Sequence, residues 1–212
     1  MITAASFSFI VMGAFYGLTA GISPGPLLTL VITETLKHGR KEGIKVASAP
    51  LITDLPIILI TSYIFSELSQ FNIILGLISF LGAVFFIFLG VGTIRTRRHY
   101  VELGIHKTES LKKGITANIL NPHPYFFWLT VGIPTAFKAF NTSLITVVLY
   151  FLLFYIMLVG SKISVAYLAE KSRNFLTNKA YTLTMKILGI ALFIFAALFI
   201  LDGIKMLRDI PV

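Results

Sequence analysis

The sequence predicts an all-α membrane protein in which six transmembrane helices form two inverted three-helix repeats. The first observation behind this prediction is composition: 56% of the 212 residues are hydrophobic, only 13% are charged, and the mean hydropathy is +0.88. Such values are typical of integral membrane proteins. The second is that most charged residues lie between long apolar runs. The third is a pair of proline motifs, one early in each half of the chain, whose first prolines, Pro24 and Pro122, are 98 residues apart.

The six spans follow the apolar runs, because a helix needs about 20 mostly apolar residues to cross the hydrocarbon core of a membrane. They are Phe7–Ile32, Val46–Phe65, Ile73–Ile94, Gly114–Phe137, Leu144–Leu168 and Leu183–Met206. We interpret residues 1–212 as a single transmembrane domain. Residues 1–94 form its first repeat, residues 95–113 a basic loop, and residues 114–212 its second repeat. An odd number of spans in each half inverts the halves relative to each other, and transporters built in this way bind substrate between the repeats.

The first span is interrupted by Ser23-Pro24-Gly25-Pro26. Proline lacks a backbone N–H and clashes with the preceding turn, so we expect the helix to break there. A break at membrane depth is tolerated where it is buried in protein or lines a polar cavity. The half-helix that begins at Pro26 presents unpaired amides that favour an anionic group such as a carboxylate. The alternative is a kink that only improves packing. Glu34, near the end of this span, is expected to extend to water.

Asp54 lies in the middle of the second span, where an isolated charge costs at least about 2.5 kcal/mol. Lys162 lies within the fifth span, and these two are the only unambiguous charges inside the membrane. We expect them either to form a static ion pair or to take part in moving protons and solute. The third span and Ile187–Leu201 of the sixth contain no charged residue, and we expect them to pack against other helices or lipid.

The fourth span contains the second motif, Asn121-Pro122-His123-Pro124. We expect it to break this helix as well, although residues 114–120 could instead form an interfacial turn before a span that begins near Pro124. His123 is a candidate proton carrier, because imidazole exchanges protons near neutral pH; a hydrogen-bonded turn residue is the alternative. Asn121, like Ser23, is a candidate cap for the half-helix that follows it.

The basic residues predict the orientation. Fourteen of the 18 Lys and Arg residues lie in or beside the connections after spans one, three and five. They are Lys37, Arg40, Lys41, Lys45, Arg95, Arg97, Arg98, Lys107, Lys112, Lys113, Lys171, Arg173, Lys179 and Lys186. Positive charge marks cytoplasmic connections, so both termini are expected outside a plasma or bacterial inner membrane. The net charge of +9 then reflects topology and not nucleic-acid binding.

In this order, Pro24-Gly25-Pro26, Asp54 and Asn121-Pro122 resemble the LysE/RhtB superfamily of small exporters. Its members have Pro-Gly-Pro in the first span, an acidic residue in the second and Asn-Pro at the start of the fourth. The resemblance implies export of amino acids or related small polar solutes, driven by proton exchange, with no enzymatic activity and no cofactor. The chain departs from many members at His123, where they have lysine, and at Lys162. It contains no cysteine, which excludes the related redox carriers.

We therefore expect a secondary exporter with its substrate site between the repeats and with a small molecule and the lipid bilayer as partners. The candidate substrate-binding residues are Ser23, Pro24, Gly25, Pro26, Asn121, Pro122, His123 and Pro124, and the candidate proton-coupling or ion-pair residues are Asp54 and Lys162. A divalent-cation exporter is one alternative, although a single aspartate beside a lysine is a poor ligand set. A membrane-embedded enzyme or a structural membrane protein are the others. The small polar volume of one protomer is compatible with a homodimer.

Overall fold

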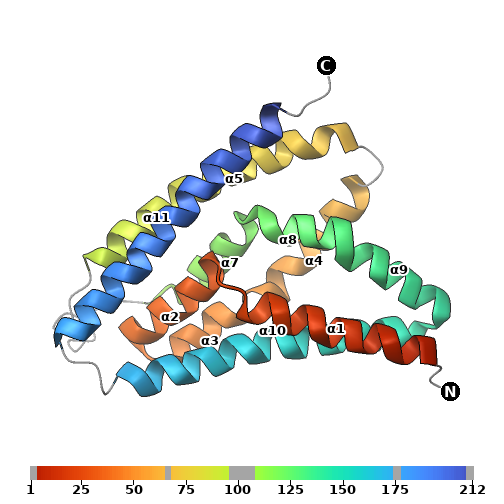
Figure 1. The fold of residues 1–212 in the computed structure, drawn as a ribbon, viewed down its shortest axis with the longest axis horizontal. Helices are drawn as coiled ribbons and strands as arrows, with labels where there is room; N and C mark the ends of the chain where they lie inside the picture. The colour runs from red at the N-terminus through yellow and green to blue at the C-terminus, as the bar shows by residue number, and fades with distance from the viewer. Residues whose placement is uncertain (1–3, 65–67, 96–107, 174–177, 209–212) are drawn as a thin grey trace.

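The structure is a computed structural model that describes residues 4–64, 68–95, 108–173 and 178–208. Within these ranges all regular secondary structure is helical and no strand forms, so the chain has the predicted all-α fold (Figure 1). The helices of the first half are α1 (Ala4–Ile22), α2 (Pro26–His38), α3 (Arg40–Ala47), α4 (Pro50–Ile64) and α5 (Leu68–Ile94). Those of the second half are α7 (Ser110–Ile119), α8 (Pro122–Phe127), the π-helical turn η1 (Trp128–Gly132), α9 (Ile133–Thr142), α10 (Leu144–Arg173) and α11 (Asn178–Arg208).

Among the described residues, four helical segments are long and apolar enough to cross a membrane, as expected of a multi-pass membrane protein. They are Arg40–Ser62, Gly76–Ile94, Leu144–Ser172 and Lys179–Arg208. A fifth is obtained if Ser6–Ile22 and Pro26–His38 count as one span bent by 59°. The sequence predicted six. The difference lies at Gly114–Phe137, which is divided among four short helical elements and is not one continuous helix.

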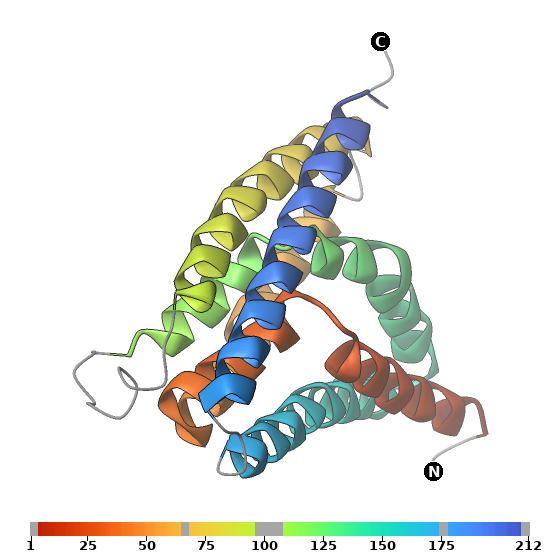
Figure 2. The same ribbon diagram turned by 60° about the vertical axis from the view of Figure 1, so that its left-hand side comes forward.

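The long helices form two pairs, α1 with α10 and α5 with α11 (Figures 1 and 2). The pairs converge where α10 ends and α11 begins, and they diverge toward the two chain termini. We call the converging end the basic end. Its Lys and Arg residues on the α2–α3 corner, α7, α10 and α11 are Lys37, Arg40, Lys41, Lys45, Lys112, Lys113, Lys171, Arg173, Lys179 and Lys186.

A row of glycines brings α1 against α10. Gly13, Gly17 and Gly21 recur every fourth residue, so they lie on one face of α1. A Cβ added to Gly13 or Gly17 would lie 2.4 Å or 2.1 Å from the backbone oxygen of Tyr150 or Phe154, which is too close for any side chain. Small residues at this spacing are the usual means of close helix packing in membranes. This row was not singled out in the sequence, although its spacing is visible there.

Both proline motifs lie at junctions between two helices in the middle of the molecule, and the last residues of each motif begin the second helix. α1 ends at Ile22 and α2 begins at Pro26, while α7 ends at Ile119 and α8 begins at Pro122. Together with α4, these helix ends occupy the space between the two long pairs (Figure 1). The interruptions therefore bring backbone ends from both halves of the chain to one region.

Candidate functional site

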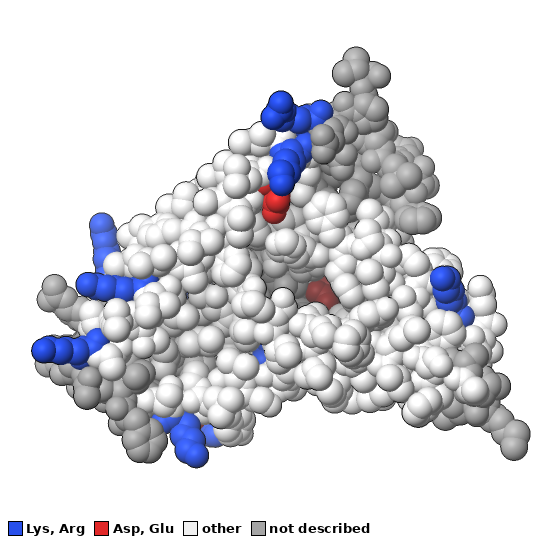
Figure 3. Space-filling model, viewed as in Figure 1, with Lys and Arg blue, Asp and Glu red and all other residues white. Residues whose placement is uncertain are grey.

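A cavity of about 290 Å³ lies between the two halves of the chain. Its walls come from the α1–α2 interruption, α4, the α7–α8 interruption, η1, α10 and α11. Ser23, Pro24, Gly25, Pro26, Asp54, Asn121, His123, Pro124 and Lys162 all line it, together with Asn118, Phe127, Trp128, Phe154, Leu158 and Phe195. Nine of the ten candidate residues from the sequence thus surround one space, and Pro122 does not border it. Figure 3 shows the molecule hollowed near the middle of this face, with acidic atoms deep in the hollow.

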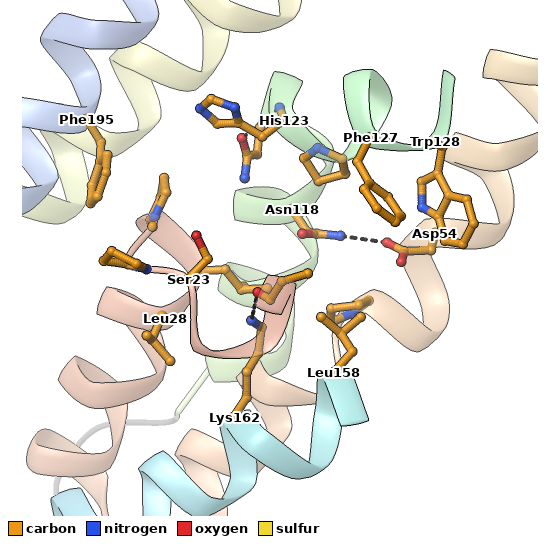
Figure 4. Close-up of a pocket in the computed structure, with 18 of the residues that line it drawn as sticks. Ser23, Leu28, Asp54, Asn118, His123, Phe127, Trp128, Leu158, Lys162 and Phe195 are labelled. Carbon is orange, nitrogen blue, oxygen red and sulfur yellow. Dashed lines mark hydrogen bonds between the residues drawn. The ribbon is translucent and has the colours of Figure 1, made fainter. Parts of the chain in front are cut away.

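Asp54 forms one wall of the cavity and is only 4% exposed. Pro50, which starts α4, lies one turn before it on the same face, so both residues line the cavity. The side-chain amide of Asn118 donates to Asp54 Oδ1 at 3.1 Å (Figure 4). It also donates to Thr53 Oγ1 at 2.6 Å. The indole of Trp128 also reaches the carboxylate. The buried carboxylate is therefore held by neutral donors, which leaves its charge available to a bound cation or proton.

Lys162 approaches the cavity from α10 and is also 4% exposed. Its ammonium group donates to the backbone oxygens of Ala20 at 3.1 Å and Gly21 at 2.9 Å. Because α1 ends at Ile22, these carbonyls belong to its last turn and have no amide partner further along the helix. A cation at this position caps the helix and complements its dipole.

Asp54 and Lys162 do not form a direct ion pair, which was one of the two alternatives predicted from the sequence. Among the salt bridges of the described residues, none joins these two side chains, although the two charges interact electrostatically across the cavity. Figure 4 shows them reaching the cavity from different helices. A space bordered by a carboxylate on one side and an ammonium on another can accept a solute that carries both charges.

The two interruptions differ in the donors that they leave free. In the described part of the chain no side chain caps α2, whose N-cap is Gly25, so Ser23 does not take the capping role considered for it. The backbone amides of Leu27 and Leu28 lie in the first turn of α2, so the helix contains no carbonyl four residues earlier to accept their hydrogen bonds. Both residues line the cavity. The helix N-terminus that faces the cavity with unpaired donors is therefore that of α2.

The N-terminus of α8 is closed in comparison. The side chain of Asn121 accepts a hydrogen bond from the amide of His123 at 3.0 Å, as expected of a cap. Pro122 and Pro124 have no N–H to offer. The His123 ring packs 5.9 Å from the ring of Phe199, measured between centroids, at the α11 side of the cavity.

Aromatic side chains cover the side of the cavity next to Asp54. The ring of Phe127 stacks on Phe154 with centroids 5.4 Å apart, and Trp128 meets Phe154 edge to face at 5.1 Å. Trp128 starts the π-helical turn η1, and such turns are frequent at functional sites. These rings provide an apolar surface for the uncharged part of a solute.

Sequence reasoning missed several of the lining residues, among them Asn118, Phe127, Phe154, Leu158 and Phe195. Asn118 is the most consequential, because it is the hydrogen-bond partner of Asp54. The sequence did place the side-chain amide of Asn118 within a predicted span, but an amide there indicates a functional site less strongly than a charged group does. No group of three or more His, Asp or Glu side chains gathers into a metal-binding arrangement in the described ranges.

Comparison with known proteins identifies one family. The model of the family described as LysE type translocator matches residues 18–203. The match includes both proline motifs, Asp54, Asn118 and Lys162. No curated protein and no solved structure is significantly similar to the chain.

Proposed function

Since the chain belongs to the LysE type translocator family, we propose that it exports an amino acid or a related small zwitterionic solute in exchange for protons. Family membership supports a membrane transporter of small molecules over an enzyme. The observation that supports the finer proposal is the single cavity shared by Asp54, Lys162 and the open N-terminus of α2.

In the proposed complex the carboxylate of the solute lies at the amides of Leu27 and Leu28, near Lys162. Its ammonium group lies at Asp54, and the rings of Phe127 and Trp128 cover its aliphatic part. The cavity volume of about 290 Å³ is at the small end for ligand pockets, which suits a solute the size of an amino acid. All of these residues line the same space.

Proton coupling follows from competition for Asp54. A carboxylate binds either a proton or an ammonium group, but not both at full strength. A proton taken up on the outside therefore promotes release of the solute, and release of that proton inside prepares the site for the next one. Lys162 stays on the carbonyls of Ala20 and Gly21 when the site is empty.

The membrane arrangement that we propose has six crossings in one domain, with residues 1–94 and 114–212 as inverted repeats. The α1–α2 and α7–α8 interruptions support it, because each half contributes one broken element to the same cavity. The basic end would face the cytoplasm, with both termini outside. Alternating access would result from rocking of one long helix pair against the other.

The divalent-cation alternative has less support. Among the described residues that line the cavity, Asp54 is the only acidic one, whereas Mn²⁺ and similar ions prefer several oxygen ligands. Lys162 in the same cavity adds a repulsive charge.

The test is uptake of a panel of radiolabelled amino acids into inverted vesicles whose lumen is more acidic than the medium. Asp54→Asn removes a charged partner, an effect of about 1.5–3 kcal/mol, so we expect proton-driven uptake to fall by about 10- to 150-fold. Asp202→Asn makes the same chemical change on α11, outside the cavity lining, and should transport normally. Unchanged uptake by Asp54→Asn would remove the proposed mechanism.

A further inference from the structure

A second cluster of charged side chains lies outside the cavity, at the basic end. Glu34 of α2 is only 1% exposed, although the sequence suggested that it would reach water. Its carboxylate accepts hydrogen bonds from Ser110 Oγ at 2.6 Å and from Lys113 Nζ at 2.9 Å, and both donors belong to α7. His38 Nε2 lies 3.9 Å away. A buried carboxylate of the first half is thus held by a helix of the second half.

An apolar layer separates this cluster from the cavity. It consists of Leu30 and Val31 of α2, Val46 and Ala47 of α3, Ala117 of α7 and Ala166 of α10, all of them fully buried and all in one core cluster. None of these side chains can hydrogen-bond a passing polar solute. The layer therefore closes the direct route between the cavity and the basic end.

The order of residues along the helices places the layer between the two polar regions. On α2, Leu27 and Leu28 line the cavity, Leu30 and Val31 belong to the layer, and Glu34 follows. On α7 the order from cavity to layer to charged cluster follows decreasing residue number. Asn118 lines the cavity, Ala117 belongs to the layer, and Lys113 and Ser110 bind Glu34. Any route from the cavity to the basic end between these helices must separate α2 from α7.

We propose that Glu34, Ser110 and Lys113 form the cytoplasmic gate of the transport cycle. Their hydrogen bonds hold α2 against α7, keep the apolar layer shut and close the cavity on the cytoplasmic side. They must break before solute can enter from the cytoplasm. This inference rests on the proposed function, since it takes the basic end as cytoplasmic and the chain as an exporter.

α7 also joins the gate to the cavity. Ser110, Gly114, Ala117 and Asn118 are its buried residues and share one face. Eight residues, about 12 Å of helix, separate Ser110 at the gate from Asn118 at Asp54. A movement of α7 that breaks the gate therefore also withdraws the amide donor from Asp54. Opening toward the cytoplasm and the state of the coupling carboxylate change together.

The gate can be tested by thiol labelling, because the chain contains no cysteine. Val31→Cys places a single thiol of similar size in the apolar layer. We expect a membrane-impermeant thiol reagent, applied to inverted vesicles, to label this residue slowly. Adding Glu34→Gln should raise the labelling rate about tenfold, since it replaces a charge-assisted contact with a neutral one.

A matched control is available at the same end of the molecule. Glu170 of α10 accepts from the backbone amide of Arg40 at 2.9 Å and lies outside the gate. Glu170→Gln should leave the labelling rate unchanged. Lys113→Gln should raise it as Glu34→Gln does, and combining the two should add little, because both remove one interaction.

Equal labelling with and without Glu34→Gln, in protein that is folded by circular dichroism and size-exclusion chromatography, would overturn the gate. An equal rise with Glu170→Gln would do the same. If Glu34→Gln does not fold, Ser110→Ala decides the matter. It removes the 2.6 Å hydrogen bond without changing a charge, and an unchanged rate would refute the proposal.

The gate and the proposed function can fail separately. Labelling requires neither a known substrate nor a proton gradient. Faster labelling without amino-acid uptake would keep the gate and reject the substrate class. Normal proton-driven uptake with unchanged labelling would keep the exporter and reject the gate.

Discussion

Gly17→Ala should weaken the protein by forcing α1 away from α10. An added Cβ would lie 2.1 Å from the backbone oxygen of Phe154 and 2.8 Å from its carbonyl carbon. Both atoms belong to the backbone of a long helix, so no side-chain rotation can relieve the contact. Restoring an ordinary separation of 3.4 Å requires the two helices to move apart by about 1.3 Å at this point.

The expected cost combines two opposing effects. Alanine is better than glycine in a helix interior by about 1 kcal/mol, whereas overpacking a close contact typically costs about 1–3 kcal/mol. The displacement also reaches the next turn of α1. The hydrogen bond from Lys162 to the oxygen of Gly21, now 2.9 Å long, would lengthen to about 4 Å, beyond hydrogen-bonding range.

Gly160→Ala provides the control. This residue lies on α10, and a Cβ built there meets no atom within 4 Å. It experiences the helix-propensity effect without the clash, so the difference between the two variants isolates the packing contact. We expect Gly17→Ala to be less stable than Gly160→Ala by about 1–3 kcal/mol.

Thermal unfolding of both purified variants in the same detergent measures this difference. At about 2–4 °C per kcal/mol for a chain of this size, the Tm of Gly17→Ala should lie below that of Gly160→Ala by about 2–12 °C. Equal transition temperatures would contradict the close approach of α1 to α10 at Gly17.

Two further predictions concern the cavity. Asn118→Ala removes the amide donor of Asp54 and should slow proton-driven uptake about tenfold. Asn141→Ala changes an exposed residue on α9 and should leave uptake unchanged. Equal uptake by the two variants would contradict the role of Asn118 as the partner of Asp54. Lys162→Met uncaps the last turn of α1 and removes the proposed partner of the solute carboxylate. This variant should raise the KM for transport about tenfold or more and lower the free energy of unfolding by about 1 kcal/mol. Lys186→Met on α11 is the control and should change neither quantity. An unchanged KM for Lys162→Met would exclude contact between Lys162 and the solute.

The parts of the site that could be predicted from the sequence are those whose chemistry is local. A proline lacks its amide wherever the chain places it, so the motifs at Pro24 and Pro122 mark helix ends without knowledge of the fold. Asp54 and Lys162 stand out because a charge in an apolar run requires an explanation. The location of these residues around one cavity followed from the placement of the motifs in the two halves.

The partners of these residues could not be predicted, because they depend on which helices meet. Asp54 and Lys162 have opposite charges, which suggested a direct pair, yet each is bound by groups from another element. Glu34 is near a helix end, where a long side chain usually reaches water, but α7 covers it and supplies Ser110 and Lys113. Such contacts are set by tertiary packing and leave no local pattern in the sequence.

The attachment of Lys162 to the end of α1 has a consequence for how tightly a solute is held. In the proposed complex the carboxylate of the solute competes with two carbonyl oxygens that already accept hydrogen bonds from the ammonium group, so it gains only the difference between the two interactions. Each 1.4 kcal/mol lost in this exchange weakens binding tenfold. We therefore expect modest affinity and short residence times, which allow a carrier to discharge its cargo rapidly even where the cargo is already abundant.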